Sequence, residues 1–287
     1  MKVHHLSCGS LCPHGRRLIN GAGGWLETAS LCCHCLLVET DERLVLVDTG
    51  LGRADLDPRH SRWPLTSRLA FGVRQNLADS AWQQVQQLGY RPQDVTDILL
   101  THMDLDHAGG LSDFPRARVH VFVDELEAAL NPRSFQARRR YLQSQWAHQP
   151  HWVIHRLGGE QWRGFASVQA LSAQETEILL VPTIGHTRGH CAVAVRSGEQ
   201  WLLHCGDAYF HHGELQRSPQ CPPALVVMQH AIAENVRQMR KNKRRLRELK
   251  LHAGGDLNLF CAHDPLELEQ YQVRQTAAVG NDYEKTC

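Results

Sequence analysis

The stretch Thr101-His-Met-Asp-Leu-Asp-His-Ala-Gly-Gly110 decides how we interpret this chain. It follows directly on Val95-Thr-Asp-Ile-Leu-Leu100, an apolar run with the length and composition of a buried strand. Two imidazoles and two carboxylates therefore fall within six residues, in a loop at the end of a strand. Both side-chain types suit divalent zinc, iron or manganese. The apolar strand before the motif and the small residues after it argue against a polar helix start, so we expect a metal site here.

Other apolar segments also end in residues that can bind a metal. The segments are 43–48, 177–181, 200–204 and 257–262, and they lead to Asp48, His186, Asp207 and His263. Functional residues are commonly held in loops at the ends of rigid strands. One strand-end histidine alone is more often structural, but the joint occurrence of His186, Asp207 and His263, in this order after the first motif, indicates that they converge on one site.

The rest of the chain alternates strand and helix patterns. We expect a hairpin of 35–39 and 43–48, a helix capped by Asp79-Ser80 and ending near 88, a strand over 118–123, helices over 124–130 and 134–147, a hairpin of 191–195 and 200–204, and one basic helix over roughly 224–250. Residues 53–78 are polar and irregular apart from Trp63, Leu65, Leu69 and Phe71. A connection of this length indicates either a lid over the site or a disordered insertion.

Composition limits the classes of function. With 31 basic against 30 acidic residues, the formal charge is +1, and nothing in it calls for nucleic acid or a membrane surface. No apolar run approaches the roughly 20 residues that a membrane span needs. The start of the chain has no apolar leader segment, so we expect a cytoplasmic protein with reduced thiols. The 42% hydrophobic content can form a sizeable core, and we expect one domain over 1–287 with its motif-bearing core at about 35–265.

Cysteines and histidines also gather near the amino terminus. They are Cys8, Cys12, His14, Cys32, Cys33, His34 and Cys35. Together they could form a further zinc site, but their spacing fits no common zinc knuckle. Buried free cysteines near the floor of the active site are the interpretation we favour, and the sequence leaves the role of the group open.

On these motifs the chain resembles the metallo-β-lactamase superfamily, over roughly residues 35–265. The matching pieces are Leu46-Val-Asp-Thr-Gly50, Thr101 to Gly110, Gly185-His-Thr-Arg-Gly-His190, Gly206-Asp207 and His263-Asp264. The nearest likeness is to the acyl-homoserine lactonase and glyoxalase II branches. The resemblance implies an α/β fold: an αβ/βα sandwich of two mixed β-sheets flanked by helices, with the metals at one edge.

The resemblance also implies a set of ligands for two divalent metal ions. The first ion takes His102, Asp104 and His186, the second takes Asp106, His107 and His263, and Asp207 bridges both. Asp48 resembles the aspartate that braces such sites through hydrogen bonds. His190 matches no ligand position and is expected in a supporting or core role. Tyr209 lies near the place of a substrate-polarising tyrosine in lactonase-like enzymes, although the offset differs.

Asp104 departs from the usual motif of the family, which has a histidine there. Two divalent cations carry +4, and Asp104, Asp106 and Asp207 contribute −3, so a bridging hydroxide would make the cluster neutral. A more neutral cluster acidifies its water less. It is also a harder site, so iron or manganese competes with zinc as the expected metal.

We therefore expect a hydrolase that cleaves a small ester, lactone or thioester with a metal-bound hydroxide, assisted by Asp106, Asp207 and Tyr209. The partner is a small molecule, with no membrane and no nucleic acid expected, and a homodimer is left open. One alternative is a mononuclear iron oxidoreductase like the persulfide dioxygenases, built on His102, His186 and Asp207. Another is a nucleic-acid phosphodiesterase that uses the basic residues of 237–250, which we otherwise interpret as a solvated helix face.

Overall fold

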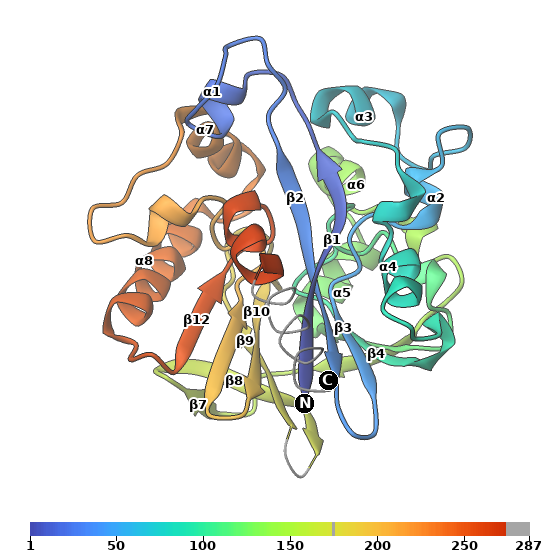
Figure 1. Ribbon diagram of the computed structural model, residues 1–287, viewed down its shortest axis with the longest axis vertical. Coiled ribbons are helices and arrows are strands. Elements are labelled where there is room, and N and C mark those ends of the chain that lie inside the picture. Colours follow the sequence, from blue (N-terminus) through green and yellow to red (C-terminus); the bar gives the residue numbers. More distant parts are fainter. Residues whose placement is uncertain (174–175, 274–287) are drawn as a thin grey trace, which may run out of the picture.

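Two six-stranded β-sheets form the centre of the protein in this computed structural model, which describes residues 1–173 and 176–273 (Figure 1). The first sheet runs in chain order: β1 (Lys2–Leu11), β2 (Leu31–Glu39), β3 (Leu44–Val47), β4 (Val95–Leu99), β5 (Arg118–Phe122) and β6 (His151–His155). Strands β1 to β3 pair antiparallel, and β3 to β6 pair parallel. Because β3 and β4 are parallel neighbours, Asp48 and His102 follow their strands at the same edge of the sheet.

The second sheet has the order β12-β11-β10-β9-β8-β7. Its strands are β7 (Glu160–Trp162), β8 (Phe165–Ala173), β9 (Thr176–Pro182), β10 (Cys191–Ser197), β11 (Gln200–His204) and β12 (Leu257–Phe260). Among the described residues of this sheet, only β11 and β12 pair parallel, and the other neighbouring strands pair antiparallel. The parallel pair again brings two strand ends together, those that lead to Asp207 and His263.

Helices cover the outer faces of both sheets. They are α1 (Arg16–Ile19), α2 (Arg53–Leu56), α3 (Leu65–Phe71), α4 (Ala81–Gln87), α5 (Val123–Leu130), α6 (Phe135–Arg140), α7 (Pro223–Ile232) and α8 (Val236–His252), with short 3₁₀ turns at Leu77–Asp79, Pro92–Asp94, Leu111–Asp113, Gln143–Gln145 and His212–Leu215. Helices α2 to α6 lie on the side of the first sheet, and α8 lies against the second (Figure 1). None of the helices in the described part of the chain is long and apolar enough to cross a membrane.

The core between the sheets is built by alternation along the strands. Leu36 and Val38 of β2 pack with Val193 and Val195 of β10 and with Phe260 of β12. The intervening side chains point to the outer faces, where two further clusters pack beneath the helices. This arrangement confirms the predicted α/β sandwich of two mixed sheets.

Several predicted elements need correction. The single basic helix over 224–250 is wrong, because α7 ends at Ile232 and α8 begins again after Asn235, whose side chain accepts from the Gln238 amide. At this break the Glu234 amide donates to the His186 carbonyl and the Asn235 amide to the Gly185 carbonyl. The interruption therefore fastens the loop that carries His186, an interaction across the fold that no local pattern contains.

The helix predicted over 134–147 is also too long, since regular helix covers only Phe135–Arg140 and ends before Tyr141, which is buried. Strands β1, β6, β7 and β8 were not predicted. The buried positions of β1 include His4 and His5, so the strand lacks the run of apolar residues that would predict it. Five predicted elements are confirmed: 35–39, 43–48, 95–100, 118–123 and 124–130. Their ends agree with the structure within one or two residues, except that β2 begins four residues earlier, at Leu31.

Candidate metal centre

Seven imidazole and carboxylate side chains meet at one edge of the sandwich, where the ends of β4, β9, β11 and β12 lie together. They are His102, Asp104, Asp106, His107, His186, Asp207 and His263, the full set expected as ligands from the sequence. The four loops that carry them come from both sheets. The predicted convergence is therefore present in the folded chain.

The first half of this cluster is compact. His186 Nε2 lies 3.0 Å from Asp104 Oδ2, and His102 Nε2 lies 3.5 Å from the same oxygen. These three residues each offer a ligand atom within 4.8 Å of the others. They are the three that the sequence assigned to one ion.

The second half is more spread out. His107 Nε2 and His263 Nε2 lie 3.2 and 3.1 Å from Asp207 Oδ1. His263 Nε2 also lies 3.6 Å from Asp106 Oδ2. A carboxylate oxygen of Asp106, a ring nitrogen of His263 and the sulfur of Cys33 lie within 4.8 Å of one another. The ligand atoms of His107, His102 and Asp207 form a second group of this kind.

Asp207 lies between the two halves. Its Oδ1 faces His107 and His263, while its Oδ2 lies 3.4 Å from His186 Nε2 and 3.8 Å from His102 Nε2. The two oxygens of one carboxylate therefore face different pairs of imidazoles. Burial opposes ionisation of Asp207, but His263 and His107 hold the pKa of its carboxyl well below the usual range.

Unsatisfied polar atoms test whether a cation fits this cluster. In the described part of the chain, His102 Nε2, His107 Nε2 and Asp207 Oδ1 are buried and have no hydrogen-bond partner. Such atoms are rare in folded proteins, because an unpaired buried polar atom loses its hydration without compensation. Imidazole nitrogens and carboxylate oxygens are the ligands that divalent zinc, iron and manganese accept. The donor set fits a metal centre.

Asp48 fixes the orientation of one imidazole in the cluster. It accepts from Thr101 N at 2.8 Å and Thr101 Oγ1 at 2.7 Å, and its Oδ2 lies 2.8 Å from His107 Nδ1. The backbone of Asp48 has φ +54°, a left-handed conformation uncommon for a residue with a side chain. Although burial opposes it, the neighbouring His107 lowers the pKa of Asp48. The brace predicted for Asp48 is thus present, and it turns His107 Nε2 toward Asp207.

His190 supports the turn that presents Asp207. Its Nε2 accepts from the Asp207 backbone amide at 2.9 Å, and its Nδ1 lies 3.0 Å from Thr183 Oγ1. Both ring nitrogens are therefore engaged, which agrees with the supporting role expected for it. Gly206, at φ +51°, allows this close approach, because a β-carbon there would lie 2.7 Å from His190 Nε2.

Arg140 is a residue of this site that the sequence did not indicate. Its Nη1 donates to Asp104 Oδ1 at 3.1 Å, and its Nη2 donates to the carbonyl of Ile232. The side chain is only 7% exposed. Despite burial, the guanidinium of Arg140 holds the pKa of Asp104 well below its usual range. The charge count made from the sequence is therefore incomplete, since a buried cation offsets the carboxylate that replaces the usual histidine.

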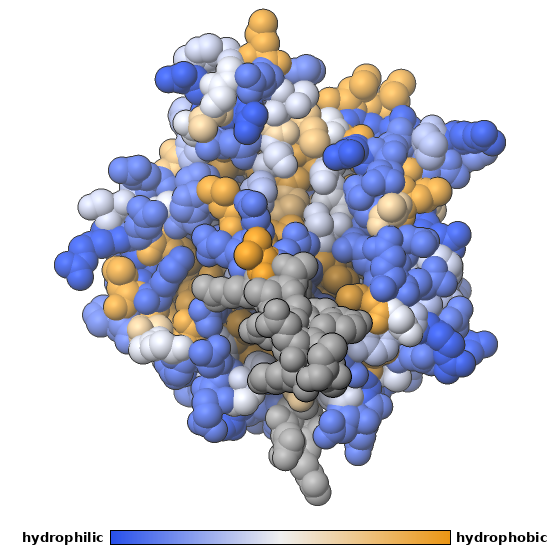
Figure 2. All heavy atoms as spheres, viewed as in Figure 1, coloured by the Kyte–Doolittle hydropathy of each residue, from blue (hydrophilic) through white to orange (hydrophobic). Residues whose placement is uncertain are grey.

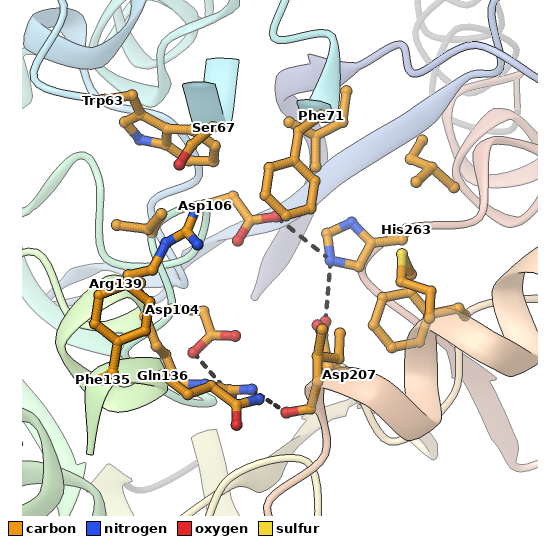
Figure 3. Close-up of a pocket in the computed structure, with 17 residues that line it drawn as sticks. Trp63, Ser67, Phe71, Asp104, Asp106, Phe135, Gln136, Arg139, Asp207 and His263 are labelled. Carbon is orange, nitrogen blue, oxygen red and sulfur yellow. Dashed lines mark hydrogen bonds and ion pairs between the residues drawn. The ribbon is translucent and has the colours of Figure 1, made fainter. Parts of the chain in front are cut away.

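A cavity of about 420 Å³ opens above the cluster. Figure 3 shows that this space is surrounded by Asp104, Asp106, Asp207 and His263 and by the aromatic side chains of Trp63, Phe71 and Phe135. The segment 53–78 thus contributes Trp63, Ser67 and Phe71 to the wall, as expected of a covering segment. Leu65 and Leu69 of that segment instead face outward, with 62% and 73% of their surface exposed. Figure 2 shows hydrophobic residues on this face between α1 and α7 on one side and α3 on the other.

The prediction that Tyr209 contacts substrate is wrong. Its side chain is fully buried, and its hydroxyl donates to Glu267 at 3.0 Å. It packs in the cluster beneath α8 and is not among the residues around the cavity, whereas Asp207 and Phe210 are. The offset of two residues from Asp207 turns Tyr209 away from the metal centre.

Five of the eight basic residues of α8 have structural partners, among them Arg240, which donates to His230 Nε2 at 3.1 Å. Lys243 pairs with Glu214, Arg245 lies over the ring of Phe165, Arg247 donates to the Glu214 carbonyl, and Lys250 lies 3.8 Å from Glu267. Arg237, Arg240, Lys241 and Arg244 are exposed. Several basic side chains of α8 therefore hold the helix against the rest of the fold, which weakens the nucleic-acid alternative.

Among the described residues, the amino-terminal cysteines do not come together in one group of potential zinc ligands. The cysteines within the described residues are free, and Cys8, Cys32, Cys33 and Cys35 are buried. Within the described part of the chain, Cys8, Cys12, His14, Cys32 and Cys35 belong to no group of potential ligands. The favoured interpretation of buried thiols near the floor of the site agrees with this arrangement.

A sandwich of two mixed sheets with a histidine and aspartate cluster at one edge defines the class as metallo-β-lactamase fold. The family model of the metallo-beta-lactamase superfamily matches residues 32–255. The chain therefore belongs to this superfamily, which confirms the predicted resemblance, the fold and a metallo-β-lactamase-fold enzyme.

The similar proteins include a probable metallo-hydrolase and several lactonases. A protein of Mycobacterium tuberculosis described as a probable metallo-hydrolase is 44% identical over 280 residues, covering 97% of this chain and 84% of that protein. An N-acyl homoserine lactonase of Bacillus cereus is 31% identical over 98 residues, or 33% of this chain and 38% of that protein. An N-acyl homoserine lactone hydrolase structure with N-hexanoyl-L-homoserine at its catalytic metal centre has a TM-score of 0.68 at 20% identity, covering 94% of this chain and 95% of that one. A dizinc quorum-quenching lactonase has a TM-score of 0.59 at 18% identity, with 92% and 87% covered.

Proposed function

We propose that this chain is a metal-dependent hydrolase that cleaves a small lactone, ester or thioester with an apolar acyl group, using two divalent cations. The observation that carries the proposal is the position of Asp207, whose two oxygens face different pairs of imidazoles at the floor of the cavity. A carboxylate placed in this way suits a bridge between two ions. The 44% identity to a probable metallo-hydrolase supports the reaction class.

When bound, two adjacent divalent cations supply a Lewis acid for the substrate oxygen and a nucleophile from water at neutral pH. The chain's own residues do the rest. Asp48 and the Cys32 carbonyl fix the His107 and His263 rings through their Nδ1 atoms, at 2.8 and 2.7 Å. Hydrogen bonds of this kind orient ligands and make them more basic.

Asp106 is the residue we assign to proton transfer. Its side chain is 15% exposed and lines the cavity, and its carboxylate makes no hydrogen bond within the described residues. A carboxylate that lines the cavity can receive a proton and pass it to the leaving group. Both oxygens of Asp207 face imidazoles, so we assign Asp207 to metal binding and Asp106 to proton transfer.

The cavity supports a substrate with an apolar portion. Its wall includes Leu11, Leu31, Trp63, Leu105, Phe210, Met228 and Ile232. The volume of about 420 Å³ falls within the range of roughly 300–1,000 Å³ for small-molecule sites. The likeness to homoserine lactone hydrolases favours an acyl lactone among the esters, lactones and thioesters expected from the sequence.

Zinc is the metal we propose first, with iron and manganese as alternatives because of Asp104. The pairing of Asp104 with Arg140 reduces the difference from a histidine-bearing site, since the pair has no net charge. The buried free thiols support a reducing, cytoplasmic setting. The single domain over 1–287 is part of the same proposal.

Metal content and hydrolysis should be measured together. Protein purified without added metal is analysed for metal per chain, and then assayed on N-acyl homoserine lactones, aryl esters and acyl thioesters of increasing chain length. We expect about two ions per chain and a preference for longer acyl groups. A single iron per chain with oxygen consumption on a persulfide would favour the oxidoreductase alternative and overturn the proposal.

A further inference from the structure

Cys33 places a thiol beside the second half of the metal centre. Its sulfur, an Asp106 oxygen and a His263 nitrogen all lie within 4.8 Å of one another. The residue is on β2 and is only 2% exposed. On its strand face it packs with Leu31, Leu105 and Phe210, which line the cavity. The thiol is therefore at the boundary between the cavity wall and the metal centre.

Three other buried thiols of the described residues have hydrogen-bond partners that Cys33 lacks. Cys32 Sγ lies 3.5 Å from the Ala262 carbonyl, Cys191 Sγ 3.4 Å from that of Leu100, and Cys205 Sγ 3.5 Å from that of Leu203. Cys33 makes no hydrogen bond of this kind with any part of the chain that the structure describes. It lies instead next to Asp106, a carboxylate that is likewise without a hydrogen bond within those residues.

Besides Asp207, whose Oδ1 lies 3.1 Å from His263 Nε2, the second half of the centre offers Asp106 and His263 one further close ligand. His107 is grouped with His102 and Asp207, so the compact set that contains Asp106 and His263 is completed by Cys33. Nearby, His107 Nε2 and Asp207 Oδ1 are buried without a partner, which independently indicates an ion on this side.

We propose that Cys33 is a ligand of the second cation, together with Asp106 and His263; the inference rests on the proposed metal-dependent function. Zinc binds sulfur at about 2.3 Å and imidazole nitrogen at about 2.0–2.1 Å in tetrahedral geometry, so two ligand atoms of one ion lie about 3.6 Å apart. The three atoms lie within 4.8 Å of one another, so they would have to close by up to about 1.2 Å around an ion. The thiol gives its proton to solvent as the zinc–sulfur bond forms.

A thiolate would give the two metal positions different chemical character. The first position has two imidazoles and the carboxylate of Asp104, a harder set that accepts iron or manganese. Sulfur makes the second position softer and favours zinc there. The centre would then hold zinc more tightly at Asp106, Cys33 and His263 than at the first position.

Cobalt(II) is the probe for the test, because a cobalt–thiolate bond adds a charge-transfer band in the near ultraviolet to the visible bands of the ion. The metal-free full chain is titrated with cobalt(II) while both spectral regions are recorded. We expect the near-ultraviolet band in the wild type and its loss in Cys33→Ser, with the visible bands retained. Cys35→Ser is the matched control, because Cys35 lies on the same strand and face and packs in a different cluster. It should retain the band.

The outcomes separate this inference from the proposed function. Two cobalt ions per chain with visible bands but without the near-ultraviolet band in the wild type would overturn Cys33 ligation and leave the metal centre intact. Failure to bind cobalt at all would overturn the proposed function itself. If Cys33→Ser does not fold, zinc X-ray absorption of the wild type decides: sulfur scattering at about 2.3 Å supports the inference, and only nitrogen and oxygen scattering overturns it.

Discussion

Two groups of buried histidines differ in what they face. At the metal centre, His102, His107, His186 and His263 direct ring nitrogens toward carboxylates. Between the sheets, His5, His34 and His204 face one another and aromatic rings. His5 Nδ1 lies 2.8 Å from His34 Nε2, His204 Nε2 donates to the His34 carbonyl at 2.6 Å, and His34 stacks on Phe260 at 4.6 Å. We call this second group the inner histidine cluster.

The two groups show that partners, not burial alone, decide what a histidine can do. Burial lowers the pKa of an imidazole, but Asp207 outweighs it at His107 and His263 and raises their pKa. In the inner histidine cluster no carboxylate outweighs burial, and the pKa of His5 falls to about 3. The first group is an electrostatic site for cations, and the second is a neutral part of the core. The 19 histidines of the sequence include both groups.

The largest expected difference between the groups is in metal binding. Replacing Asp207 by Ala should release both ions and reduce hydrolysis by at least about 10³-fold, because the loss of metal assistance costs several kcal/mol of transition-state stabilisation. Metal analysis and rates on the best substrate give the measurement. His34→Gln is the control, since it alters the inner histidine cluster and should keep both ions. Full metal occupancy in Asp207→Ala would refute the bridging role.

Arg140→Met should have the next largest effect, on stability. Removing one partner of a buried ion pair costs about 3–5 kcal/mol, because Asp104 would stay buried without its counterion. The loss should be greatest in metal-free protein and smaller with zinc, since a cation can replace the guanidinium. Urea unfolding with and without zinc measures both values. Arg139→Met, at the exposed neighbouring position, should change the free energy of unfolding little. Equal losses in the two variants would show that the ion pair of Arg140 with Asp104 does not stabilise the fold.

The inner histidine cluster should make the protein sensitive to acid. In the unfolded chain His5 takes up a proton near pH 6.5, but in the folded chain its pKa is about 3. Between these values the unfolded state binds more protons, so stability is lost as the pH falls, by up to about 1.4 kcal/mol per pH unit for one histidine. The loss from pH 7 to pH 5 should therefore be about 2 kcal/mol from His5.

His5→Phe should make this pH dependence shallower, even if the variant is less stable at pH 7. Unfolding in urea at several pH values measures the slope. His151→Gln, at an exposed position, should keep the wild-type slope. An unchanged slope in His5→Phe would mean that the inner histidine cluster is not the acid-sensitive region.

The smallest expected effect concerns Tyr209. Tyr209→Phe removes a hydroxyl that donates to Glu267, while Glu267 still accepts from the Cys261 amide at 2.8 Å. We expect a stability loss of about 1 kcal/mol and hydrolysis within about twofold of the wild type. A tenfold drop in rate with both metals bound would restore Tyr209 to the substrate site.

The sequence by itself determined the sandwich and the members of the metal cluster. The site is specified by a buried strand followed at once by His102, by an earlier strand that leads to Asp48, and by three later strands that lead to His186, Asp207 and His263. Strand ends hold their loops in fixed positions. These signals are local, since the apolar run and the polar residue that follows lie within a few positions of each other.

Only the tertiary structure decided the partners of these residues. Arg140 reaches Asp104 from α6, Cys33 approaches Asp106 and His263 from β2, and the break between α7 and α8 is set by carbonyls of the His186 loop. Each of these contacts joins segments that are far apart in the chain. Tyr209 shows the same limit, because one or two residues of offset after a strand decide whether a side chain faces the cavity or the core, and that choice is made by packing against the rest of the fold.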